Sequence, residues 1–217
     1  MIRGVIFDMD GVMTDTERLF QELWCQVQRE RGEPEYREVV AHCIGLNHKA
    51  ISEYVAACCG PDFDYMNVLM EVGRRSGKYM EEHGVPVKPG LYQLLSDLDS
   101  AGIPYAVATS SVGKMAKERL RAIQVLHRLS ALVTGDMVSA GKPEPEIFQR
   151  AAAALHLPPE ECLVLEDSPH GIIAAHRAGC LPVMIPDLKE PDAETEKMLY
   201  ARLDHLGQVM ELIQSSI

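Results

Sequence analysis

The chain of 217 residues has no apolar run that approaches the roughly 20 residues needed to span a membrane. Its first apolar run is interrupted by Asp8 and Asp10, so the N-terminus lacks the pattern of a secretory signal. Basic residues are few, because 21 Lys and Arg stand against 32 Asp and Glu, and the formal net charge is −11. A surface that binds nucleic acid needs clustered Lys and Arg. We therefore expect a cytoplasmic protein whose partner is neither a membrane nor a nucleic acid.

Metal-binding cysteine patterns are absent as well. The six cysteines show no C-x-x-C spacing and no compact Cys/His group, which argues against a zinc site. We expect reduced thiols that pack as small hydrophobic side chains. With 47% hydrophobic residues, the chain has enough apolar material for one domain, or for one domain with a smaller insert.

Strand and helix patterns alternate over most of the chain. Apolar, β-branched segments at residues 2–7, 104–108, 131–134, 162–165 and 181–185 predict strands. Helical periodicity fills the gaps between them, as at Leu91, Leu94, Leu95 and Leu98. This order predicts the α/β fold class, with a parallel-sheet, Rossmann-like core that carries helices on both faces. Residues 187–192 are expected to form a polar surface loop or the lead-in to a helix.

Residues 16–85 differ from the rest, since no strand pattern occurs there. Segments 17–31, 50–59 and 65–83 read as helices, and the Pro- and Gly-rich segment 84–90 reads as the link back to the sheet. We expect a core made of residues 1–15 and 86–217, with an inserted α-helical domain at residues 16–85.

Polar residues follow the predicted strands where each strand ends. Asp8 and Asp10 follow the first strand, and Gly11 permits a sharp turn after them. Thr109 and Ser110 end the strand at 104–108, and a hydroxyl next to free backbone N–H groups there suits a phosphate oxygen. Glu166 and Asp167 follow the strand at 162–165.

Lys142 lies between a glycine and a proline just before a predicted helix, so its position is better defined than that of a surface lysine. Each of these signals is modest alone, since a solvated turn or an ordinary helix cap would explain it. Together they are informative, because the carboxyl ends of parallel strands meet at one edge of a sheet. Carboxylates there favour a hard cation such as Mg²⁺, and the hydroxyls and the ammonium favour a phosphoryl group.

With these motifs at residues 8–12, 108–110, 141–143 and 165–168, the chain resembles the haloacid dehalogenase superfamily, in its β-phosphoglucomutase-like subgroup with a helical cap. The resemblance covers nearly the whole chain, and residues 16–85 match the cap. It implies a Mg²⁺-dependent phosphatase that hydrolyses a small phosphorylated metabolite, a sugar phosphate or a nucleoside phosphate, through an aspartyl-phosphate. Asp8 would be the nucleophile and Asp10 the general acid and base. Groups that hold the phosphoryl would be Thr109, Ser110 and Lys142.

The resemblance also implies the metal and substrate residues. Mg²⁺ would be held by Asp8, the backbone carbonyl of Asp10 and Asp167, with Glu166 supporting it directly or through water. Substrate-binding candidates from the cap are Thr16, His48 and Arg75.

Phe20 stands where the resembled mutases carry a cap histidine, which favours a phosphatase over a hexose-phosphate mutase. A non-catalytic binding protein on the same fold is the alternative of another class, which the presence of Asp8, Asp10, Lys142 and Asp167 disfavours. A monomer is the simplest expectation for the oligomeric state.

Overall fold

The structure is a computed structural model that describes residues 1–43, 48–60 and 63–216, and of residues 48–50 only the helical backbone. Its centre is a parallel sheet in the order β3-β2-β1-β4-β5-β6. The strands are β1 (Gly4–Phe7), β2 (Tyr105–Thr109), β3 (Ala131–Thr134), β4 (Cys162–Glu166), β5 (Leu181–Met184) and β6 (Ala201–Arg202). The sheet confirms the predicted α/β class.

The strand register brings the predicted site segments to one edge. Phe7 of β1 pairs with Val107 of β2 on one side and with Leu165 of β4 on the other. The residues that follow these positions therefore lie beside one another where the three strands end. In the sheet, β2 and β3 lie on one side of β1, and β4, β5 and β6 lie on its other side. The strand order therefore switches between β1 and β4, and such a switch opens a crevice at the carboxyl edge.

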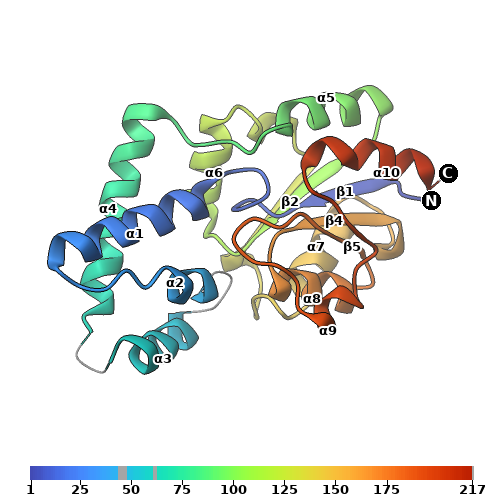
Figure 1. Ribbon diagram of the computed structural model, residues 1–217. Coiled ribbons are helices and arrows are strands. Elements are labelled where there is room, and N and C mark those ends of the chain that lie inside the picture. The colour runs from blue at the N-terminus through green and yellow to red at the C-terminus, as the bar shows by residue number, and fades with distance from the viewer. Residues whose placement is uncertain (44–47, 61–62, 217) are drawn as a thin grey trace.

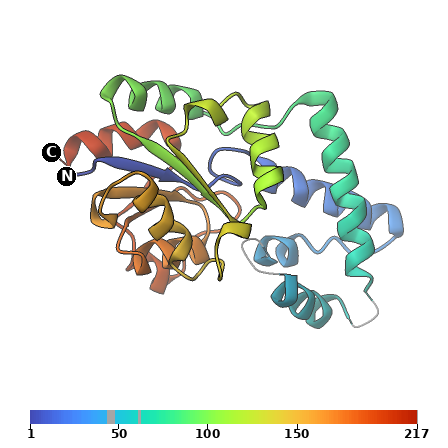
Figure 2. The same ribbon diagram turned by 180° about the vertical axis from the view of Figure 1, so that it is seen from behind.

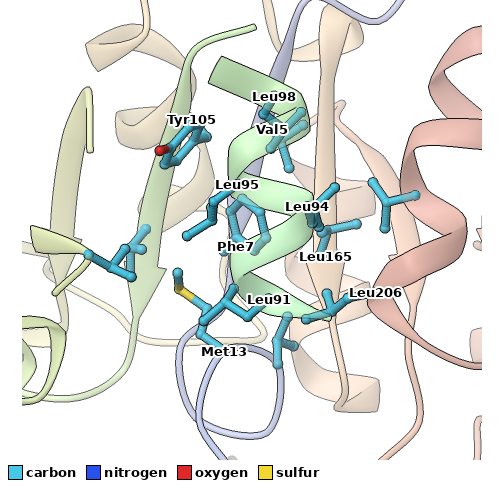
Figure 3. Close-up of a cluster of buried hydrophobic side chains, with 14 of the residues drawn as sticks. Val5, Phe7, Met13, Leu91, Leu94, Leu95, Leu98, Tyr105, Leu165 and Leu206 are labelled. Atoms are coloured by element: carbon cyan, nitrogen blue, oxygen red, sulfur yellow. The ribbon is translucent and has the colours of Figure 1, made fainter. Parts of the chain in front are cut away.

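Helices cover both faces of the sheet, as predicted (Figure 1). Side chains alternate along a strand, so Val5 and Phe7 face one layer and Ile6 the other. Figure 3 shows the leucines of α5 (Leu91–Ala101) packed against Val5 and Phe7. Helices α10 (Val209–Ser215) and α6 (Gly113–Ala122) cover the rest of this face. The opposite face is covered by α7 (Glu146–Ala154) and α8 (Pro169–Arg177).

Among the residues that the structure describes between β1 and α5, four helices pack on one another rather than on the sheet. These cap helices are α1 (Thr16–Arg31), α2 (Arg37–Cys43), α3 (His48–Cys59) and α4 (Tyr65–His83). They share a hydrophobic cluster that is separate from the two clusters of the sheet and has Trp24 and Val68 among its buried members. Both views show them at the end of the molecule opposite the chain termini (Figures 1 and 2). The division into a core of residues 1–15 and 86–217 and a cap of residues 16–85 stays a prediction.

Some short elements had no sequence prediction, α2 and β6 among them. Helix α2 is only seven residues long, and β6 has two residues, so neither is long enough for a clear periodic pattern. The segment at 187–192 is a helix lead-in, because Asp192 caps α9 (Ala193–Glu196). The side chain of Asp187, at the start of this segment, is nevertheless only 1% exposed. No helix in the described part of the chain has the length and apolar character needed to cross a bilayer.

Candidate active site

A cavity of about 370 Å³ lies between the carboxyl edge of the sheet and the cap helices. It brings together most of the residues that the sequence singled out. The predicted site residues that line it are Asp8, Asp10, Thr16, Thr109, Ser110, Lys142, Glu166 and Asp167. Residues from β1, β2, β4, α1 and the loop before α7 thus meet around one space.

The loop after β1 packs directly against the loop after β4. The backbone N–H of Asp8 donates to the carbonyl of Leu165 over 2.9 Å. Gly11 has a φ of +90°, and a Cβ atom there would lie 2.2 Å from Oδ2 of Asp167. Only glycine satisfies both conditions, because other residues rarely adopt this φ and all of them carry a Cβ. Gly11 therefore allows the carboxylate of Asp167 to lie against the first loop.

Lys142 joins two carboxylates at the bottom of the cavity. Its Nζ donates to Asp8 Oδ1 and, over 2.6 Å, to Glu166 Oε1, and its side chain is 4% exposed. Burial alone would lower the pKa of this ammonium, but the charges of Asp8 and Glu166 outweigh it and raise the pKa. Lys142 is therefore a fixed positive charge next to Asp8.

Asp8 is buried among charged groups. The pKa of Asp8 is raised to about 7. Burial and the negative charge of Glu166 raise it, while the positive charge of Lys142 lowers it. A carboxylate in such a place keeps little of its hydration, which favours its reaction with an electrophile once a cation balances its charge.

Glu166 organises the loop that follows β4. Its Oε2 accepts hydrogen bonds from the N–H groups of Asp167 and Ser168, each 3.0 Å, and from the Ser168 hydroxyl at 2.9 Å. Ser168 in turn caps α8 by accepting from the N–H of Gly171. Because its other oxygen binds Lys142, the Glu166 carboxylate has protein partners on both oxygens.

Asp10 accepts hydrogen bonds from three sides of the cavity. Ser111 Oγ donates over 2.9 Å, Thr16 Oγ1 over 2.5 Å and Arg119 Nη1 over 2.6 Å. Ser111 and Arg119 have no place in the sequence predictions. Ser111 directly follows the predicted Thr109 and Ser110, so its position in the sequence could have identified it as a site residue. Arg119 lies two turns into α6, and the sequence alone does not tell which way that helix face points.

A group of acidic side chains lies at the border between core and cap. One carboxylate oxygen from each of Glu17, Asp167 and Asp187 lies within 4.8 Å of the others. Burial is the main cause that raises the pKa values of Glu17 and Asp167 well above their ordinary ranges. Nearby negative charges raise them further, those of Asp167 and Asp10 for Glu17 and those of Glu166 and Asp8 for Asp167. Oε2 of Glu17 and Oδ2 of Asp187 are buried and have no hydrogen-bond partner among the described residues. Carboxylate oxygens that lie close together and lack hydrogen-bond partners are suitable ligands for a hard divalent cation.

This acidic group differs from the predicted ligand set. It contains Asp167, but Asp8 and Glu166 are joined through Lys142 instead, and Glu17 and Asp187 were not predicted. Glu17 directly follows the predicted Thr16, so its position in the sequence could have identified it as a site residue. Asp187 follows β5 and comes near the others only through the fold.

The predicted cap residues have different outcomes. Thr16 reaches Asp10, as described above. Arg75 is not among the described residues that line the cavity, because its guanidinium pairs with Glu30 over 2.6 Å and with Glu71 over 2.7 Å between α1 and α4. His48 begins α3, and its side chain lies outside the described residues. The basic group that the described structure does add to the lining, besides Lys142, is Arg119.

Comparison with known proteins agrees with this architecture. The profile of the haloacid dehalogenase-like hydrolase family matches residues 5–185. The chain is 31% identical over 214 residues to the validoxylamine A 7'-phosphate phosphatase of Streptomyces hygroscopicus subsp. limoneus, covering 95% of this chain and 99% of that protein. It is 30% identical over 188 residues to the β-phosphoglucomutase of Bacillus subtilis (strain 168), covering 84% of this chain and 82% of that one.

A solved structure supports the same assignment. The crystal structure of a HAD family hydrolase from Deinococcus radiodurans R1, with bound phosphate and sodium, superposes with a TM-score of 0.81 at 25% identity. The alignment covers 99% of this chain and 96% of the other. The profile match spans most of the chain and confirms the resemblance drawn from its four motifs. The chain belongs to the haloacid dehalogenase-like hydrolase family.

Proposed function

We propose that the protein is a Mg²⁺-dependent phosphatase that hydrolyses a small phosphorylated metabolite, a sugar phosphate or a nucleoside phosphate, through an aspartyl-phosphate. One observation carries the proposal. The buried carboxylate of Asp8 touches the fixed ammonium of Lys142 in the same cavity that holds Asp10. A nucleophile, a positive charge for the phosphoryl group and a second carboxylate for proton transfer are thus within one space. The relative from Streptomyces, named as a phosphatase, supports this choice.

Each of these groups has a defined part in the reaction. An oxygen of Asp8 forms a bond to phosphorus while the ester P–O bond breaks, and Asp10 gives a proton to the leaving alkoxide. Asp10 then takes a proton from the water that hydrolyses the aspartyl-phosphate. Lys142, Thr109 and Ser110 hold the phosphoryl oxygens. Positioning and charge neutralisation supply most of the catalysis in phosphoryl transfer, and these side chains provide both.

The acidic residues fit a magnesium ion beside Asp8. Asp8, the backbone carbonyl of Asp10 and Asp167 would hold it, and the buried, underused oxygen of Glu17 lies in the same acidic group. When bound, Mg²⁺ neutralises negative charge on the phosphoryl oxygens and on the carboxylates. Lys142 keeps its own contact with Asp8, so two kinds of positive charge would serve the reaction.

A mutase remains the second enzyme candidate, because the chain has a β-phosphoglucomutase relative. Phe20 lines the cavity at the position where the resembled mutases carry a histidine. A phenyl ring has no polar atom to bind a sugar hydroxyl, and this favours the hydrolase.

All six cysteines are free thiols, which agrees with a proposed cytoplasmic location. We keep the monomer as a proposal.

Phosphate release from a panel of phosphomonoesters tests the proposal. We expect release that requires Mg²⁺, stops with EDTA and is absent in Asp8→Asn. Interconversion of sugar phosphates with little release would instead identify a mutase. Binding of phosphate esters without either reaction would identify a non-catalytic protein and contradict the proposal.

A further inference from the structure

The wall that the cap helices give to the cavity is apolar. It joins the hydrophobic cluster of the cap, which thus faces the catalytic edge of the sheet instead of being closed off from it. Its principal side chains are Phe20, Trp24, Val40, Ile51, Val55 and Tyr65. Part of the wall is formed by three neighbouring rings from α1 and α4. The Trp24 ring centroid lies 6.0 Å from that of Phe20 and 5.9 Å from that of Tyr65.

These rings are held firmly. Trp24 is 3% exposed and Tyr65 is 8% exposed, so each has most of its surface packed inside the cap. Phe20 is half-buried and lies in α1, four residues after Thr16. Phe20, the most exposed of the three rings, can offer a flat ligand dispersion contacts and aromatic edge or face contacts, with Trp24 and Tyr65 packed beside it.

Three hydrogen-bonding side chains near this wall are already occupied, whereas Oε2 of Glu17 and Nε1 of Trp24, which also line the cavity, have no partner among the described residues. Thr16, Ser111 and Arg119 each donate to Asp10. A polyol on the alcohol side of the ester would lose its hydration when it binds. Among the described residues of this wall, it would find few free hydrogen-bond partners. Hydroxyl groups that lose hydration without new hydrogen bonds weaken binding, whereas apolar surface that leaves water strengthens it.

We propose that the alcohol part of the substrate carries a flat aromatic group that lies against Phe20, Trp24 and Tyr65. This inference rests on the proposed function and narrows it. Among the two substrate classes proposed above, it selects nucleoside phosphates, whose base is a flat ring, over sugar phosphates. Asp8 and Lys142 bind the phosphoryl end, and the cap helices select the other end.

Matched esters test the inference. 2-Phenylethyl phosphate and glucose 6-phosphate both release a primary alcohol, so their intrinsic reactivities are similar and kcat/KM compares their fit. We expect kcat/KM to be at least about tenfold higher for the aromatic ester, since burying a ring of this size corresponds to a factor of ten or more. Phe20→Ala should reduce that ratio about tenfold. Tyr79→Ala, an exposed ring of α4 that does not line the cavity, should leave it unchanged.

A binding measurement separates this inference from the proposed function. In Asp8→Asn, titration calorimetry and the fluorescence of Trp24, the single tryptophan, report binding of both esters without turnover. Tighter binding of 2-phenylethyl phosphate supports the inference even if no ester is hydrolysed or Phe20→Ala fails to fold. Equal or tighter binding of glucose 6-phosphate overturns it. Absence of phosphate release from every ester contradicts only the proposed function.

Discussion

Among single residues, Arg119 makes the least expected contact of the site. It comes from the second turn of α6 and donates to Asp10 over 2.6 Å, with both side chains mostly buried. Thr14, Thr16 and Ser111 also donate to the Asp10 carboxylate, but only Arg119 brings a full charge. Since Asp10 is the proposed proton donor and acceptor, its orientation depends on these contacts.

Replacing Arg119 should therefore impair turnover more than folding. Arg119→Ala is expected to lower kcat/KM by about 10- to 100-fold, because a hydrogen bond to a charged group contributes about 1.5–3 kcal/mol. Arg119→Lys should retain more activity than Arg119→Ala. Steady-state kinetics with any ester that the wild type hydrolyses provide the measurement. Arg121→Ala is the control, because Arg121 is exposed on the same helix and does not line the cavity. Equal rates for Arg119→Ala and Arg121→Ala would contradict the assigned role.

At the level of elements, α8 fits closely against the end of β4. A Cβ atom on Gly171 would lie 1.8 Å from Cδ of Glu166, so the first turn of the helix leaves no space for a side chain. Glu166 has little freedom to move, because Lys142, Ser168 and its own loop hold both of its oxygens. Glycine at this position thus permits the helix and the carboxylate to share the same corner.

Gly171→Ala should accordingly destabilise the fold and displace Glu166. We expect the free energy of unfolding to fall by about 1–3 kcal/mol, as for other overpacked sites. Activity should fall as well, since Lys142 loses a partner. The matched control is Gly77→Ala in the interior of α4, where a Cβ would meet nothing within 4 Å. That change should stabilise by up to about 1 kcal/mol, because alanine favours helix over glycine. Urea denaturation of both variants distinguishes them, and similar effects would refute the packing argument.

A second element-scale feature is an ion cluster at the junction of cap and core. Asp187, after β5, accepts from Lys88 over 2.7 Å and from Arg18 of α1 over 2.6 Å, and Lys88 also pairs with Asp15 over 2.9 Å. Asp15 precedes α1, and Lys88 follows α4 in the returning link. The cluster therefore ties both connections of the cap helices to one buried carboxylate of the core.

Asp187→Ala should loosen this junction. We expect a loss of about 2–3 kcal/mol in stability, below the usual 3–5 kcal/mol for a broken buried pair because Arg18 is half exposed. Hydrogen exchange in residues 13–17 and 84–88 should become faster when measured in EDTA, which removes any effect of bound cations. Glu144→Ala breaks a surface bridge to Arg177, in which both side chains are about half exposed, and should cost less than about 1 kcal/mol. Unchanged exchange in both segments would show that the cluster does not hold the junction.

For the whole molecule, the buried carboxylates make stability depend on pH and on cations. Burial raises the pKa of Asp8 from 3.8 to about 7 and raises that of Asp167 as well, the latter also through Glu166 and Asp8. Between about pH 4 and pH 7, the folded metal-free protein thus binds more protons than the unfolded chain. Its stability from this source is present at low pH and falls as the pH rises through that range.

Mg²⁺ should reverse this loss, because it competes with protons for the same carboxylates. We expect Mg²⁺ to raise Tm more at pH 8 than at pH 5.5, since a cation that binds only the folded state stabilises it. Thermal denaturation with Mg²⁺ or EDTA at each pH gives the four values needed. The Asp167→Asn variant should lose most of the Mg²⁺ effect at pH 8. An equal Mg²⁺ effect at both pH values would contradict the proposed competition.

Much of the site follows from local sequence patterns. The strands at 104–108 and 162–165 were predicted to within a residue, because a buried parallel strand is a short apolar run with a visible end. Asp8, Thr109 and Glu166 stand at such ends, so their approach follows from parallel pairing alone. Lys142 was a weaker signal, since a loop residue has no period to fix its direction, yet it contacts Asp8 as the proposed chemistry requires.

The sequence by itself thus determined the sheet apart from β6, most of the helices between β1 and α5, and the residues at the strand ends, because periodicity is a local property. Only the tertiary structure decided which side chains from outside these ends join them. It directs Arg119 and Glu17 into the cavity and keeps Arg75 between α1 and α4. It also buries Asp187, which looks like a loop residue in the sequence. The direction of a helix face, and the packing of one helix or loop against another, depend on contacts between segments far apart in the chain, which no local pattern contains.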